Sequence, residues 1–121
     1  MANVLIVDDS IVMRRNLKSI LTSAGHNVVG EAGNGNQAIV EYDKLQPDLV
    51  TMDITMPGMN GIEATKKIIE KYPKAKIVVI SALDQKSMVL EALESGAKHY
   101  IIKPITLEKA LGVIDTVLNN M

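Results

Sequence analysis

A chain of 121 residues, nearly half of them hydrophobic, is large enough for one domain with a single core and too apolar for a disordered protein. Its 13 lysines and arginines against 14 aspartates and glutamates leave a formal charge of −1, which gives no basic field for nucleic acid. The absence of cysteine excludes disulfides and thiolate metal sites, and no apolar run suits a signal peptide or a membrane span.

Five short β-branched runs alternate with helical patterns along the chain. In order, the runs are NVLIV at 3–7, HNVVGEA at 26–32, DLVTMD at 48–53, KIVVIS at 76–81 and HYIIK at 99–103. The first, third and fourth runs are continuously apolar, as expected of central strands covered on both faces. The strict alternation implies right-handed crossovers and a parallel sheet, so we expect one three-layer α/β domain over residues 1–121.

A helical pattern follows each run. Capping or breaking residues mark the expected helix ends: Gly25, Asn34, Pro47, Pro73, Asp84, Gly96 and Thr106. Of these, Asn34, Asp84 and Thr106 are expected N-caps. The last helix is expected to carry Leu107, Leu111, Ile114 and Leu118. The two histidines, His26 and His99, lie at strand starts and are expected at the surface.

Polar residues stand where the predicted strands end. They are Asp8 and Asp9 directly after 3–7, Asp53 at the end of the third run, Ser81 at the end of the fourth and Lys103 at the end of the fifth. Because the carboxyl ends of parallel strands share one edge of the sheet, these groups are expected to meet where ligands bind. Taken alone, Asp8 and Asp9 would suit a solvated loop that caps a helix. The coincidence at four strands favours a site.

The residue types in this set indicate a phosphoryl-transfer site. Three carboxylates at one edge repel each other unless a cation joins them. Oxygen ligands with open water positions suit Mg²⁺ or Mn²⁺, and the lack of nearby Cys or His disfavours zinc. Lys103 adds a fixed positive charge, and Ser81 adds a hydroxyl that can donate to an anionic oxygen. Phosphoryl transfer needs mainly positioning and charge neutralisation, which this set supplies.

Four stretches carry a family resemblance: VDDS at 7–10, MDITMPGMNG at 52–61, SA at 81–82 and KP at 103–104. They resemble the signature of response-regulator receiver domains, over essentially all 121 residues, and the chain is similar to single-domain chemotaxis regulators of the CheY type. The resemblance implies a flavodoxin-like (βα)5 fold with strand order 2-1-3-4-5. It also implies a two-component system in which Asp53 takes a phosphoryl group from the phosphohistidine of a sensor histidine kinase.

The resemblance assigns a role to each site residue. Mg²⁺ would be held by Asp8, Asp9, Asp53 and the main-chain carbonyl of Thr55. Lys103 would bind the phosphoryl oxygens, and Ser81 would move towards them. Tyr100 would follow by turning inward, which would reshape the surface of the fourth helix, fifth strand and fifth helix. The bond between Lys103 and Pro104 is expected to be cis.

The resemblance also implies partners. These are a sensor histidine kinase, the flagellar motor switch as target and a phosphatase, with no nucleic acid or membrane. The protein is expected to be a cytoplasmic monomer that catalyses only its own phosphorylation and dephosphorylation. The stretch at 87–100 holds more apolar residues than one buried stripe requires, among them Met88 and Leu90, which favours a binding surface there. Leu83, two residues after Ser81, suggests slow loss of the phosphoryl group, because leucine cannot position an attacking water, whereas Thr55 can still form a hydrogen bond.

Three other functions stay open at this point. A phosphorelay intermediate would pass its phosphoryl group to another protein. An aspartyl-phosphate phosphatase would also use a strand-end aspartate as nucleophile, but it usually needs a second acid two residues later, where this chain has Thr55. A metal-independent adaptor would keep the fold without the chemistry, although the full set of site residues argues against it.

Overall fold

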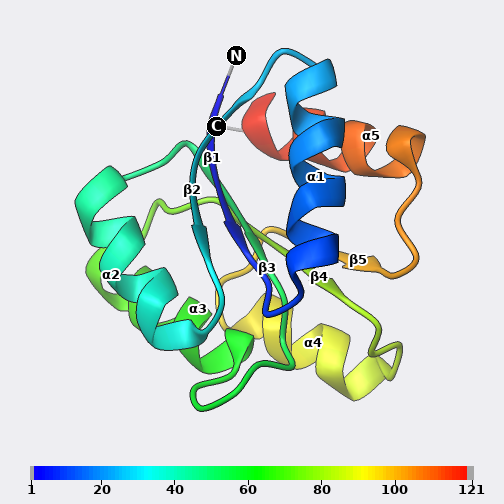
Figure 1. Ribbon diagram of the computed structural model, residues 1–121. Helices are drawn as coiled ribbons and strands as arrows, with labels where there is room; N and C mark the ends of the chain where they lie inside the picture. Colours follow the sequence, from blue (N-terminus) through cyan, green and yellow to red (C-terminus); the bar gives the residue numbers. More distant parts are fainter. Residues whose placement is uncertain (1, 120–121) are drawn as a thin grey trace.

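The computed structural model describes residues 2–119, in which strands and helices alternate strictly (Figure 1). In chain order the elements are β1 (Asn3–Val7), α1 (Ile11–Ser23), β2 (Asn27–Ala32), α2 (Gly35–Leu45), β3 (Leu49–Met52), α3 (Gly61–Lys71), β4 (Ile77–Ser81), α4 (Lys86–Glu94), β5 (His99–Ile102) and α5 (Leu107–Asn119). The strands form one parallel sheet in the order β2-β1-β3-β4-β5. The predicted flavodoxin-like α/β fold and strand order are confirmed, and predicted strand ends agree to within one residue.

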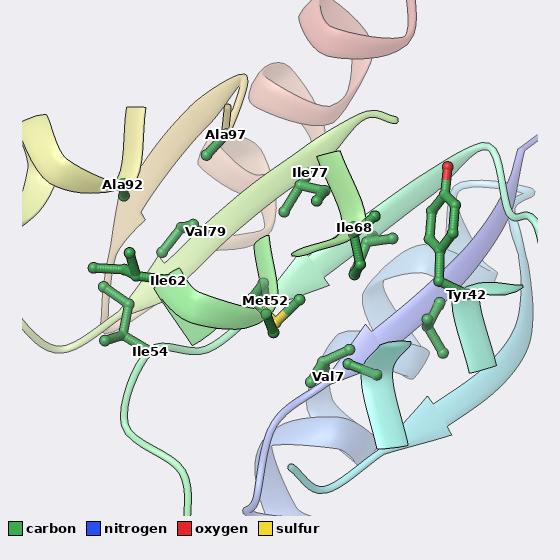
Figure 2. Close-up of a cluster of buried hydrophobic side chains, with 14 of the residues drawn as sticks. Val7, Tyr42, Met52, Ile54, Ile62, Ile68, Ile77, Val79, Ala92 and Ala97 are labelled. Carbon is green, nitrogen blue, oxygen red and sulfur yellow. The ribbon is translucent and has the colours of Figure 1, made fainter. Parts of the chain in front are cut away.

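The sheet is the middle of three layers, with α1 and α5 over one face and α2, α3 and α4 over the other (Figure 1). Each face buries its own aliphatic cluster. Figure 2 shows the larger cluster, in which Met52 and Val79 of the sheet lie beside Ile62 of α3. The smaller cluster joins Leu17 of α1 to Ile114 of α5. Because β1, β3 and β4 lie between two helical layers, their residues are apolar on both faces.

Side-chain caps start four of the helices. The cap oxygens belong to Ser10, Asn34, Asn60 and Thr106, and each accepts a hydrogen bond from a main-chain N–H in the first turn. The prediction of Asp84 as a cap was wrong. The first turn of α4 starts one residue later, because the carbonyl of Gln85 accepts the N–H groups of Met88 and Val89, and Gln85 makes no side-chain cap bond.

The expected surface position of His26 was wrong, because the residue is buried and its Nδ1 accepts the main-chain N–H of Ala2 at 3.0 Å. In α5 the buried residues are Ala110, Ile114 and Val117, with Leu118 packed against the smaller cluster, whereas Leu107 is 51% exposed. Within residues 2–119, none of the helices combines the length and hydropathy that crossing a membrane requires.

Candidate functional site

Three carboxylates meet at the carboxyl edge of the sheet. The register pairs Val7 of β1 with Met52 of β3, so Asp8 and Asp53 follow neighbouring positions, and the N–H of Asp53 donates to the carbonyl of Val7 at 2.9 Å. One carboxylate oxygen each from Asp8, Asp9 and Asp53 lie within 4.8 Å of one another. Asp8 and Asp53 are buried, whereas Asp9 is exposed. The predicted convergence of these three residues is therefore present in the structure.

The ammonium of Lys103 lies between two of these carboxylates. Its Nζ is 3.0 Å from Oδ2 of Asp8 and 3.7 Å from Oδ1 of Asp53. Lys103 reaches this position because its N–H donates to the carbonyl of Ser81 at 2.8 Å, which extends the pairing of β4 with β5. The bond from Lys103 to Pro104 is cis, as the resemblance implied. One ammonium faces three acidic groups, so the site keeps an excess of negative charge.

The environment of Asp53 opposes its ionisation. Burial raises its pKa to about 6, and the negative charge of Asp8 adds to the effect. The ammonium of Lys103 and the main-chain N–H of Ile54, which donates to Oδ1 of Asp53 at 2.9 Å, act in the opposite direction. Asp53 is thus a buried carboxylate that any additional cation at the cluster would help to ionise.

The donor set fits Mg²⁺. All three side chains offer carboxylate oxygens, the ligands that hard divalent cations prefer. The exposed carboxylate of Asp9 leaves one side open to water, and Mg²⁺ usually keeps several waters. Among residues 2–119 this is the one group of three or more acidic, His or Cys side chains close enough to hold a metal. Nothing in the geometry supports Mn²⁺, the alternative that the sequence had left open.

Ser81 and Tyr100 are both hydrogen-bonded to the main chain of Leu83. The Oγ of Ser81 accepts the N–H of Leu83 at 3.1 Å, and the hydroxyl of Tyr100 donates to the carbonyl of Leu83 at 2.7 Å. Both side chains are buried, so Tyr100 already lies in the inward position that was expected after phosphorylation. The Ser81 hydroxyl uses an oxygen lone pair for Leu83, which leaves its proton free to donate to an anionic oxygen.

Two residues at the site were missed from the sequence. A Cβ on Gly61 would lie 1.9 Å from the main-chain oxygen of Asp53, so only glycine allows α3 to start against the Asp53 peptide. Glycine at the first position of a helix, directly after a loop that follows Asp53, was the available signal. The second is Arg14, whose Nη1 donates to the main-chain oxygen of Asp8. No sequence pattern predicts which main-chain group a long arginine side chain will contact.

Comparisons with known proteins agree with this geometry. A family model described as "Response regulator receiver domain" matches residues 4–115. The chemotaxis protein CheY of Thermotoga maritima is 52% identical over 94% of this chain and 95% of that protein, and the CheY of Bacillus subtilis is 48% identical over 96% and 97%. The chain also resembles a structure titled as a CheX-CheY-BeF3-Mg complex from Borrelia burgdorferi, with TM-score 0.93, 40% identity and coverage of 95% of this chain and 87% of that chain.

Proposed function

Because this chain belongs to the response regulator receiver family, we propose that it is a phosphorylation-controlled switch in which Asp53 accepts a phosphoryl group from a histidine kinase. One observation carries the proposal. The carboxylates of Asp8, Asp9 and Asp53 converge within 4.8 Å, and the ammonium of Lys103 lies 3.7 Å from the Asp53 oxygen. A nucleophile, a set of cation ligands and a binder of anionic oxygens thereby share one edge of the sheet.

The proposed reaction starts from ionised Asp53. With a pKa of about 6, most of this carboxylate is ionised near pH 7. One of its oxygens forms the bond to phosphorus while the phosphorus–nitrogen bond to the donor imidazole breaks. Lys103 binds the phosphoryl oxygens, and the Ser81 hydroxyl donates a hydrogen bond to one of them. A bound Mg²⁺, held by Asp8, Asp9, Asp53 and the Thr55 carbonyl, would supply further charge neutralisation.

The proposed output surface lies over α4, β5 and α5. Apolar side chains from all three elements are exposed there: Leu90 by 49%, Leu93 by 40%, Ile102 by 37% and Leu107 by 51%. Apolar surface that no element of the chain covers often marks a binding face, which favours a target-binding role over a phosphorelay intermediate. The relatives named as chemotaxis proteins favour the flagellar motor switch as target. We also propose that a histidine kinase and a phosphatase are its partners, and that the protein is a cytoplasmic monomer.

Intact mass spectrometry tests the chemistry directly. The protein is incubated with acetyl phosphate, with and without Mg²⁺, as wild type and as Asp53→Ala. One phosphoryl adduct that needs Mg²⁺ and is absent from the variant supports the proposal. An adduct that persists in Asp53→Ala would reject this residue as acceptor. A folded wild type that forms no adduct would leave only the adaptor reading.

A further inference from the structure

Arg14 connects three elements next to the acidic cluster. It lies in the first turns of α1, its Nε donates to Oε1 of Glu31 on β2 at 2.9 Å, and its Nη1 donates to the main-chain oxygen of Asp8. The side chain of Arg14 is only 18% exposed, and that of Glu31 is 39% exposed. A guanidinium held at two of its nitrogens by different elements is fixed in direction as well as in place.

The carbonyl that Arg14 binds belongs to the peptide between Asp8 and Asp9. Because a peptide unit is planar, the direction of this carbonyl sets the direction in which the chain enters Asp9. Asp8 itself is held separately, since its N–H donates to Ala32 at 3.0 Å and its Oδ1 accepts the N–H of Ser10 at 2.9 Å. Asp9 is exposed and has no such contact of its own among the hydrogen bonds of residues 2–119.

We propose that Arg14 is a positioning residue of the metal site. Its guanidinium orients the Asp8–Asp9 peptide, and Glu31 holds that guanidinium in place. The inference rests on the proposed function, because it concerns the same Mg²⁺ site. Contacts behind the ligands of a metal commonly change its affinity by about 10- to 100-fold when they are removed. Arg14 makes a contact of this kind, because it binds the carbonyl of the peptide that leads into Asp9.

The positioning role and a purely electrostatic role predict opposite signs. Arg14 is a permanent cation near the cluster, so its charge alone repels Mg²⁺. If charge were its whole effect, Arg14→Met would tighten Mg²⁺ binding. If Arg14 served only the packing of α1 on β2, the variant would lower stability and leave Mg²⁺ affinity unchanged. The positioning role alone predicts weaker Mg²⁺ binding upon removal of a positive charge.

Denaturant unfolding over a series of Mg²⁺ concentrations measures this affinity without any phosphorylation, because a cation bound only by the folded state stabilises it. The variants are Arg14→Met, Arg14→Lys and Glu31→Gln, with Arg15→Met as the matched control on an exposed neighbour. We expect Arg14→Met to weaken Mg²⁺ binding about tenfold. Arg14→Lys should restore part of the affinity through one donor, Glu31→Gln should weaken binding less, and Arg15→Met should not weaken it.

The outcomes separate the two levels of the proposal. A wild type without Mg²⁺-dependent stabilisation overturns the metal site and this inference together. Wild type and Arg14→Met with equal affinity, or a tighter variant, overturn the role of Arg14 alone. If Arg14→Met does not fold, Arg14→Lys decides, because it keeps the positive charge: unchanged Mg²⁺ affinity in that variant contradicts the inference and weakened affinity supports it.

Discussion

The hydroxyl of Tyr100 donates to the main-chain carbonyl of Leu83 at 2.7 Å. The N–H of Leu83 donates to the Oγ of Ser81, so Leu83 is hydrogen-bonded to both Ser81 and Tyr100. A shift of Ser81 towards a phosphoryl group on Asp53 would act on Leu83, and through its carbonyl on Tyr100. Since Tyr100 belongs to β5, where it pairs with Val79 of β4, the shift would reach the proposed output surface.

Tyr100→Phe removes the hydroxyl and leaves the Leu83 carbonyl without this donor. We expect a loss of about 1 kcal/mol in the free energy of unfolding, and faster hydrogen exchange of the Leu83 N–H, because the loop loses one of its two contacts. Urea unfolding and amide exchange measure the two effects. Tyr72→Phe is the matched control, since its hydroxyl bonds Asp43 far from this loop. Unchanged exchange at Leu83 in Tyr100→Phe would contradict the link.

The raised pKa of Asp53 makes stability depend on pH. The folded carboxyl keeps its proton up to a pKa of about 6, whereas the unfolded one ionises near its ordinary value of about 4. Between these values the folded state binds more protons, so stability falls as pH rises from about 4 to 6. Without Mg²⁺, Asp53→Asn should therefore be more stable than wild type at pH 7, by ~2 kcal/mol, and nearly equal at pH 4.

Unfolding in urea at the two pH values tests this difference. Asp115→Asn, on the exposed side of α5, serves as a control that should follow wild type at both. An Asp53→Asn variant with the same advantage at pH 4 and pH 7 would show that the gain has another cause.

Two Gly→Ala substitutions should act in opposite directions. At Gly61 the added Cβ would collide with the main-chain oxygen of Asp53, so the start of α3 must shift and we expect a loss of about 2 kcal/mol or more. At Gly112, inside α5, the new Cβ meets nothing within 4 Å, and alanine should stabilise the helix by about 0.5–1 kcal/mol. Thermal or urea unfolding compares them. Equal changes in stability for the two variants would mean that the start of α3 is not in tight contact with the main chain of Asp53.

The features predicted from sequence are those that depend on backbone order alone. Asp8, Asp53 and Lys103 each follow a strand and Ser81 is the last residue of one, and parallel pairing brings strand ends to one edge whatever the side chains around them. The same rule placed the apolar runs at the centre of the sheet. Strand order itself came from the family resemblance, because alternation of strands and helices permits several orders.

The features that were missed depend on side chains from distant segments. Arg14 reaches Asp8 and Glu31 only once α1 lies on β2, and the buried ring of His26 finds its donor in Ala2, 24 residues away in the chain. In α5, Ala110 is buried and the larger Leu107 is exposed, a choice that the apolar character of the two residues does not reveal. Local spacing holds no information on any of these contacts.

Thr51 carries a buried hydroxyl at the centre of β3. It is 1% exposed, pairs with Ile6 and Val78, and its Oγ1 has no hydrogen-bond partner within residues 2–119. Thr51→Val replaces this hydroxyl with a methyl group of similar size, so we expect a gain of about 1 kcal/mol in the free energy of unfolding. Thr51→Ala should instead lose stability, because it leaves a cavity. Urea unfolding measures both variants. If Thr51→Val were less stable than wild type, the hydroxyl would have a hydrogen-bond partner after all.

The lifetime of a phosphoryl group on Asp53 should depend on Leu83. Its side chain is half-buried against the larger aliphatic cluster and cannot accept a hydrogen bond from water. A carboxylate two residues after Ser81 could instead orient an attacking water, as a general base does. We expect Leu83→Glu to speed phosphate release several-fold, whereas Leu83→Met, which matches the wild type in size and polarity, should leave it unchanged. Time-resolved release of inorganic phosphate from the phosphorylated proteins measures both, and a rate in Leu83→Glu no faster than in wild type would contradict a slow clock set at this position.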